Sequence, residues 1–207
     1  MDRQERSGWN FACLASSAVL FAALTAAVLA GVSDSVDAAI RGFVSAWSSP
    51  VLTSFFLAVT RLGSVAVVFS LTALVAVGLL AAGRRAMALQ LAAVMIIATF
   101  ANNAVKYAVA RARPEAFFGD VPASYSFASG HALYAGCFYG LVGAFLAAAL
   151  PHAWQRAVVL AATAALIGAV GLSRIYLGVH YPTDVVAGFA LAAFILCIGR
   201  GLFVSTR

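Results

Sequence analysis

Charged residues are scarce in this sequence, and acidic residues are the scarcest of them. Only 10% of the 207 residues are charged and seven are acidic, whereas 64% are hydrophobic. A soluble domain is usually about a quarter charged, because polar groups must cover its surface. The composition therefore excludes a water-soluble domain of this length, and lipid is the solvent that fits it.

Cysteine pairs, long polar linkers and internal repeats are also lacking. The three cysteines, Cys13, Cys137 and Cys197, lie inside apolar stretches without metal-ligand spacing, so we interpret them as small packing residues. With no linker or repeat to divide the chain, we predict a single domain over residues 1–207. The net charge of +6 comes from cations scattered at the ends of apolar stretches, a distribution that does not predict nucleic acid as a partner.

Long apolar stretches are abundant instead. A membrane-spanning helix needs about 20 mostly apolar residues, and six stretches fit: residues 10–31, 64–82, 86–107, 131–150, 156–173 and 184–204. The sequence therefore predicts an all-α, polytopic membrane bundle of six transmembrane helices. The first stretch is longer than the roughly 7–15 residues of a signal-peptide core, so we expect it to be retained as a helix and not cleaved near Gly31.

The loop after the first predicted span, residues 32–63, carries apolar residues at helical spacing: Val36, Ile40, Phe43, Val44, Trp47 and Val51. We expect an amphipathic helix lying in the headgroup region, with Trp47 at the interface. The short basic turn Gly83-Arg84-Arg85 favours an N-terminus on the inside. With that orientation, seven Lys and Arg residues lie in inside segments and six in outside segments. If three of the outside cations bind an anion, the remaining counts are seven inside and three outside.

The first polar cluster runs from Lys106 to Pro114, at the end of the third predicted span. Lys106 and Arg113 are seven residues apart and share a face if the helix continues, although Pro114 predicts a turn at Arg113. Two cations on one face can clamp a phosphate. The alternative is that both side chains reach to the interface without a ligand. We interpret Asn102 and Asn103, one turn earlier, as helix-packing residues.

The second cluster, from Tyr125 to His131, precedes the fourth predicted span. Ser129 suits a helix N-cap, and Gly130 lets an anion approach the backbone N–H groups at the start of the helix. His131 stands in the first turn, where an imidazole can donate a proton to a leaving oxygen. The alternative is a capped helix with an interfacial histidine.

The third cluster, from Ser173 to Asp184, leads into the sixth predicted span. Pro182 suits the first turn of a helix, which places His180 just before that turn and Asp184 within it. A carboxylate that accepts one imidazole N–H leaves the other nitrogen free to attack phosphorus and form a phosphohistidine. Arg174 adds a cation. The alternative, a structural His–Asp pair, does not explain why three cations, two histidines and a carboxylate gather in so apolar a chain.

These clusters resemble the three motifs of the type 2 phosphatidic acid phosphatase superfamily, which also includes vanadium haloperoxidases and bacterial undecaprenyl diphosphatases. Lys106 to Pro114 resembles the family's lysine, six residues, arginine-proline. Residues 128–131 are similar to its proline-serine-glycine-histidine, with Ala128 in place of proline. Ser173 to Asp184 matches serine-arginine, five residues, histidine, three residues, aspartate. The motifs stand in family order over residues 106–184, and the change at Ala128 alters the turn without removing a catalytic atom.

The resemblance implies that His180 is a nucleophile oriented by Asp184, and that His131 is the general acid for the leaving group. It implies a phosphate cradle made of the remaining site residues, which are Lys106, Arg113, Ser129, Gly130 and Arg174. It implies a lipid phosphate as substrate, with membrane lipids around it. It also implies no metal and no other cofactor, because the cations supply the positive charge.

We therefore expect a lipid phosphatase of the bacterial cytoplasmic membrane whose site faces the extracytoplasmic side. Undecaprenyl diphosphate is the first expected substrate, with phosphatidylglycerol phosphate, phosphatidate and lipid A phosphates as alternatives. A lipid-anion transporter is a different class of function, and it is disfavoured because the charges cluster at span ends and not at the bilayer midplane. A vanadate-dependent haloperoxidase is disfavoured by the membrane-embedded composition. The sequence does not give the oligomeric state.

Overall fold

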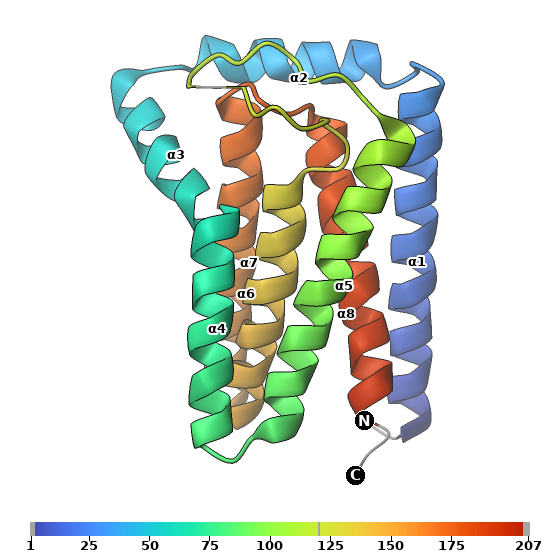
Figure 1. The fold of residues 1–207 in the computed structure, drawn as a ribbon, viewed down its shortest axis with the longest axis vertical. Helices are drawn as coiled ribbons and strands as arrows, with labels where there is room; N and C mark the ends of the chain where they lie inside the picture. Colours follow the sequence, from blue (N-terminus) through green and yellow to red (C-terminus); the bar gives the residue numbers. More distant parts are fainter. Residues whose placement is uncertain (1–2, 120, 205–207) are drawn as a thin grey trace.

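The computed structural model describes residues 3–119 and 121–204, and these fold into eight α-helices without a β-strand. The helices are α1 (Arg3–Leu29), α2 (Asp34–Ala46), α3 (Pro50–Leu62), α4 (Val65–Ala81), α5 (Arg85–Val109), α6 (Gly130–Ala149), α7 (Ala153–Tyr176) and α8 (Pro182–Val204). The helices α1 and α4 to α8 run side by side, and α2 lies across their upper ends (Figure 1). A coil over residues 110–119 and 121–129 crosses the same end.

Five helices are long and apolar enough to cross a membrane: α1 from Phe11, α5, α6, α7 and α8 up to Gly199. The 17 residues of α4 fall short of the roughly 20 that a span needs. Together with α3, from which it bends by 46°, α4 makes a possible sixth span. The all-helical expectation is confirmed for the described residues, and the count of six spans stays a prediction.

The segment expected to form one amphipathic helix forms two. Ser49 caps α3 by accepting a hydrogen bond from the backbone N–H of Leu52, and Pro50 takes the first helical position, so the chain turns between Ala46 and Pro50. In α2 the buried side chains are polar, namely Asp37 and Arg41. Val36, Ile40, Phe43 and, at its end, Trp47 are exposed, whereas Val44 is half-buried and packs against the cluster around Phe56 and Tyr176. That this outer face lies among lipid headgroups stays a prediction.

The centre of the bundle is formed by α6 and α8, which pack against each other. In the apolar stretches of α6 and α8, 56% and 61% of the residues are buried inside the protein. In α1, which packs on the outside of α8, only 11% are buried. The main core joins these two helices to α4 and α5 through side chains such as Val68, Met95, Leu133 and Ile195. The sulfur atoms of Cys13 and Cys197 lie 2.7 Å apart where α1 meets α8, a contact that the sequence did not indicate.

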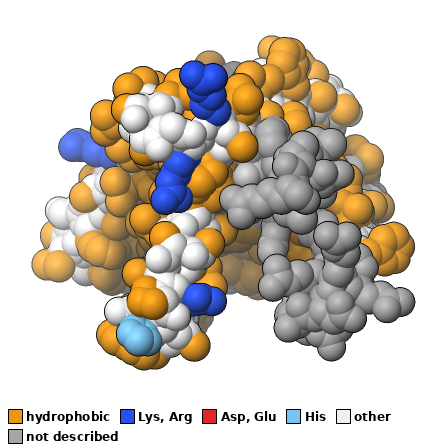
Figure 2. Space-filling view, turned by 90° about the horizontal axis from the view of Figure 1, so that it is seen from below, with side chains coloured by type: hydrophobic (Ala, Val, Ile, Leu, Met, Phe, Trp, Pro, Cys, Tyr) orange, Lys and Arg blue, Asp and Glu red, His pale blue; other side chains and the backbone are white. Residues whose placement is uncertain are grey.

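The lower end of the bundle carries cations. Seen from below, it shows several Lys and Arg side chains and one histidine, and no acidic side chain is visible among the described residues there (Figure 2). The turns α4–α5 and α6–α7 lie at this end, and Arg84, Arg85 and Arg156 beside them are exposed. All three motif clusters lie at the opposite end, because α5 and α7 finish there while α6 and α8 begin there.

Candidate active site

The structure brings the eight predicted site residues to the upper end of the bundle, from four helices and two connecting segments. Lys106 lies in the last turn of α5, Arg113 in the coil that follows, Ser129, Gly130 and His131 at the start of α6, Arg174 in the last turn of α7, His180 between α7 and α8, and Asp184 in the first turn of α8. Residues up to 78 positions apart therefore share one end of the bundle.

The ring of His180 is buried, and its tautomer follows from its neighbours. Its Nε2 lies 2.9 Å from Nη1 of Arg113. An arginine only donates hydrogen bonds, so Nε2 is the acceptor and Nδ1 carries the proton of the neutral ring. Burial is the main cause that lowers the pKa of His180, to about 4, despite the nearby carboxylate of Asp184. The ring is thus neutral near pH 7, with its lone pair on Nε2.

Asp184 receives hydrogen bonds on both carboxylate oxygens and is fully buried. Its Oδ2 lies 3.3 Å from Nδ1 of His180 and accepts from the backbone N–H of Tyr181 and the hydroxyl of Ser126. Its Oδ1 accepts from Nη1 of Arg111 at 2.8 Å. A buried carboxylate with this many donors is fixed in orientation and stays ionised. Asp184 is therefore placed to hold the Nδ1–H of the histidine.

The coil after α5 carries Arg113 to the site. The helix ends at Val109, with Ala110 in the left-handed region, so Lys106 and Arg113 do not share a helix face as a continuous helix would require. The guanidinium of Arg113 donates to the carbonyl of Ser124 at 2.6 Å and that of Val179 at 2.9 Å. Burial lowers the pKa of Arg113, and the charge of Asp184 opposes this shift. It remains a cation, because an arginine pKa starts above about 12.

Gly178 sets the turn that presents His180. Its φ of +78° lies in the left-handed region, and a Cβ there would come within 2.4 Å of the backbone nitrogen of Phe117. Only glycine has both the backbone freedom and the room that this turn requires. Arg41 of α2 fastens the same turn, since its Nη1 donates to the Gly178 carbonyl at 2.6 Å.

Three polar atoms near the start of α6 have no hydrogen-bond partner within the described part of the chain, although they are buried. They are Oγ of Ser129, Nε of Arg174 and Oδ1 of Asn102. Ser129 occupies the N-cap position, but its hydroxyl makes no cap bond. Buried polar groups without partners are rare in proteins, and they are typical of functional sites that bind a ligand. Together with the first N–H groups of α6, they form a site suited to an anion.

His131 and the remaining cations face this same site. A Cβ on Gly63, at the junction of α3 and α4, would lie 3.2 Å from the His131 ring, so the glycine makes room for it. The charges of Arg174, Arg113 and Lys106 act on His131, as does His180, which places it near them. Lys106 donates to the carbonyl of Tyr125, and Nη1 of Arg174 donates to Oγ1 of Thr60 at 2.6 Å.

Sequence reasoning missed several polar residues that contact the site. Ser126 bonds to Asp184, and Arg111 joins Asp184 to Asp37 of α2. Asn102, interpreted as a packing residue, lies beside Gly130. The sequence offered one signal for these contacts, which is that the chain has only seven acidic residues. An acidic side chain buried in so apolar a chain needs a polar or cationic partner. Ala128, which differs from the family proline, is buried and follows a cis peptide bond.

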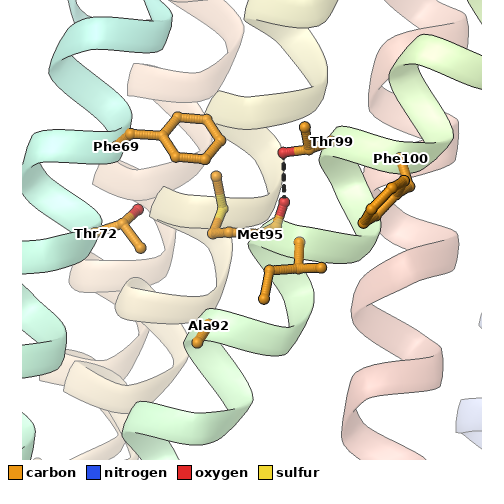
Figure 3. Close-up of a pocket in the computed structure, with 7 residues that line it drawn as sticks. Phe69, Thr72, Ala92, Met95, Thr99 and Phe100 are labelled. Atoms are coloured by element: carbon orange, nitrogen blue, oxygen red, sulfur yellow. Dashed lines mark hydrogen bonds between the residues drawn. The ribbon is translucent and has the colours of Figure 1, made fainter.

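A shallow pocket between α4 and α5 is separate from these groups. It has a volume of about 350 Å³, and its wall is formed by Phe69, Thr72, Ala92, Met95, Ile96, Thr99 and Phe100 (Figure 3). Both threonines in it bond back to their own helix, as Thr99 does to the carbonyl of Met95 at 2.8 Å. No charged or free polar group points into it, so it lacks the means for phosphate chemistry.

Comparison with known proteins shows the family and the fold of this chain. The sequence profile of the PAP2 superfamily matches residues 87–204. The chain is 29% identical over 184 residues to phosphatidylglycerophosphatase B of Bacillus subtilis, covering 88% of this chain and 91% of that protein. It is 33% identical over 106 residues to an undecaprenyl-diphosphatase of Sulfolobus acidocaldarius, covering 48% and 47% of the two chains. The crystal structure of a transmembrane PAP2 type phosphatidylglycerolphosphate phosphatase from Bacillus subtilis superposes with a TM-score of 0.86 at 28% identity, over 94% of this chain and 97% of that one.

Proposed function

Because this chain belongs to the PAP2 superfamily and is an integral membrane phosphatase acting on lipid phosphates, we propose that it works through a phosphohistidine on His180. The observation that carries the proposal is the environment of that ring. Its Nδ1–H faces Asp184, and its Nε2 lone pair faces Arg113, a cation that can bind the phosphate under attack. The chain would act as a single domain, and its oligomeric state is left open.

The proposed reaction has two steps. Arg113 moves from Nε2 to the phosphate oxygens, and Nε2 attacks phosphorus in line with the leaving oxygen. His131 donates a proton to that oxygen, so the alcohol or phosphate leaves neutral or singly charged, and the N–P bond replaces the P–O bond. Water activated by His131 then attacks the phosphohistidine and releases inorganic phosphate and His180.

We propose that the phosphate lies in a cradle of cations and backbone donors. Lys106, Arg113 and Arg174 surround the start of α6, where the Ser129 hydroxyl and the Gly130 N–H are available. Fixed donors aimed at the equatorial oxygens stabilise the charge of the transition state without reorganisation. Arg174 supports this role because its Nε is buried without a partner and gains one when an anion binds.

For the substrate we propose phosphatidylglycerol phosphate first, supported by the Bacillus subtilis phosphatase that matches nearly the whole chain. Undecaprenyl diphosphate, the substrate expected from the sequence, is the second candidate, and the partial match to an archaeal undecaprenyl-diphosphatase supports it. We further propose that the protein lies in the bacterial cytoplasmic membrane. The basic lower end would be cytoplasmic, so the site would face the extracytoplasmic side.

The test is phosphate release by the purified protein in bilayer nanodiscs from a panel of these two lipids, phosphatidate and a lipid A phosphate. We expect release in the presence of excess EDTA at the rate measured without it, because cationic side chains and not a metal neutralise the phosphate. Phosphatidylglycerol phosphate should be the fastest substrate. A rate that EDTA abolishes and Mg²⁺ restores would contradict the mechanism, and a faster rate with undecaprenyl diphosphate would reverse the order of substrates.

Ser126→Ala should slow the same reaction by about 10-fold to 100-fold, because a hydrogen bond to a charged group contributes about 1.5–3 kcal/mol. The lost hydroxyl is buried and donates to Oδ2 of Asp184, the oxygen nearest His180. Ser124→Ala is the matched control for the removal of a hydroxyl from the same coil. Ser124 Oγ contacts only the exposed side of Arg113, so its loss should cost less than Ser126→Ala, and the reverse order would count against this role.

A further inference from the structure

The helix α2 reaches the site through a buried carboxylate. The side chain of Asp37 is completely buried. Its Oδ1 accepts the backbone N–H of Thr183 at 3.0 Å, and its Oδ2 accepts the hydroxyl of Thr183 at 2.7 Å and Nη2 of Arg111 at 2.8 Å. Thr183 directly precedes Asp184. Asp37 is therefore fixed to the first turn of α8 and to an arginine that contacts the site.

Arg111 bridges two buried carboxylates. Its Nη2 donates to Asp37 and its Nη1 to Oδ1 of Asp184, both at 2.8 Å. The face of its guanidinium lies 3.9 Å from the ring centre of Tyr181. Burial lowers the pKa of Arg111, but the bond to Asp37 and the charge of Asp184 outweigh it and the pKa rises. Because both Nη atoms are hydrogen-bonded and the Tyr181 ring covers one face, the planar guanidinium has little freedom to rotate.

This bridge decides which oxygen of Asp184 faces the histidine. Arg111 holds Oδ1, so Oδ2 is left for Nδ1 of His180. Asp37 also balances the charge of Arg111. Without that balance Asp184 would be the only buried carboxylate paired with the guanidinium, and the positive charge would reduce the negative potential that supports the histidine as it becomes positive during attack.

We propose that Asp37 and Arg111 are positioning residues of the reaction, acting on His180 through Asp184 from the helix that lies across the bundle. The proposal rests on the proposed function, in which His180 is the nucleophile. Neither residue belongs to the proposed phosphate cradle. Their removal should therefore lower kcat and leave KM nearly unchanged.

Asp34 supplies a matched control. It also contacts Nη2 of Arg111, at 3.3 Å, but its side chain is 70% exposed, whereas that of Asp37 is 0% exposed. Asp37→Asn and Asp34→Asn each replace a carboxylate that pairs with Arg111 by a neutral amide. Because water screens the exposed pair, we expect Asp34→Asn to keep kcat within about twofold of the parent. Asp37→Asn should lower kcat by about 10-fold or more, with KM within about threefold.

Substitutions of Arg111 give a second, independent measurement. Arg111→Lys keeps the charge but can satisfy only one carboxylate well, so it should retain more activity than Arg111→Met. All variants are compared in nanodiscs, and the thermal midpoint of unfolding is measured for each. A loss of kcat that merely follows the fraction of folded protein would assign the bridge a structural role and overturn the proposal.

The pKa of His180, measured by NMR, distinguishes an electrostatic effect of Asp37 and Arg111 from a general loss of structure. The chain has three histidines, so ¹⁵N-histidine NMR resolves His180 once His131→Asn and His152→Asn have assigned the others. The charged groups that face His180 are Asp184 from α8, Arg113 from the coil, Arg174 from α7 and Arg41 from α2, whose Nη1 lies 3.5 Å from the His180 carbonyl, with His131 close by on α6. None of them changes in the variants of Asp37 and Arg111.

The direction of each shift follows from Coulomb's law. Asp37→Asn removes a negative charge behind Asp184 and should lower the pKa of His180, whereas Arg111→Met should raise it. Opposite shifts with reduced kcat in both variants support the proposal. Equal kcat in Asp37→Asn and Asp34→Asn, or no shift in either variant, would overturn it. The NMR measurement needs no substrate, so its outcome stays readable even if no lipid phosphate is hydrolysed, a result that would instead refute the proposed function.

Discussion

His180→Asn is expected to abolish phosphate release from every lipid phosphate, with a loss of about 10³-fold or more. The asparagine side chain has no nucleophilic nitrogen, so the phosphoenzyme cannot form. Arg113, which lies beside His180, remains in the variant and can still bind a phosphate, so the loss reports the missing nucleophile and not a missing phosphate site. Release of phosphate from the lipid panel, normalised to folded protein, measures the effect.

His152 provides the matched control for this substitution. It lies exposed at the opposite end of the bundle, where it occupies the N-cap position of α7, a position that asparagine suits well. His152→Asn should therefore keep full activity. If His180→Asn also kept its activity, or if trapped protein carried phosphate on another residue, the nucleophile would be assigned wrongly.

His131→Asn is expected to give an effect that depends on the leaving group. With a lipid alkyl phosphate the loss should be about 10²-fold to 10⁴-fold, the usual contribution of a general acid. With 4-nitrophenyl phosphate the leaving phenolate needs no proton, so the first step should stay fast while hydrolysis of the phosphohistidine is slowed. The expected observation is a burst of one nitrophenolate per site followed by slow turnover, with acid-labile phosphate on the protein.

The two histidine variants thus separate the two roles. His180→Asn should show neither burst nor turnover, and His152→Asn should match the parent in both. A uniform loss in His131→Asn for all leaving groups would place His131 in phosphate binding and not in proton transfer. Its position among Arg174, Arg113 and Lys106, beside Gly63, is consistent with contact to the bound substrate.

The helices α5 to α8 were predictable because lipid imposes a simple rule on the sequence. A span must be apolar along its whole length, and the observed ends differ from the predicted ones by only a few residues, as for α6, predicted at 131–150 and found at Gly130–Ala149. The segment 32–63 was less predictable. Its periodicity indicates a helix, but Pro50 divides it into two, and periodicity alone does not tell which face of α2 meets the protein.

The motif residues were predictable because their order and spacing are distinctive. The residues that hold them in place through hydrogen bonds were not predictable. Asp37 meets Arg111 across 74 positions, and Ser126 meets Asp184 across 58. Contacts at such separations leave no periodic pattern in one sequence. The turn that brings them together depends on Ala110 and on the coil after it, where propensity gives little guidance. The sequence therefore indicated which motif groups meet at this end of the bundle, and not which groups hold them in place.

The outward apolar side of α2 has a consequence for how this catalyst can be studied. Val36, Ile40 and Phe43 project away from the protein, while Asp37 and Arg41 reach inward to the segment that carries His180. The surroundings of the molecule therefore contact the helix that holds the segment carrying His180, the proposed nucleophile. A detergent that packs poorly against α2 would loosen the site without contacting it. Turnover numbers measured in micelles would therefore depend on the detergent as well as on the protein.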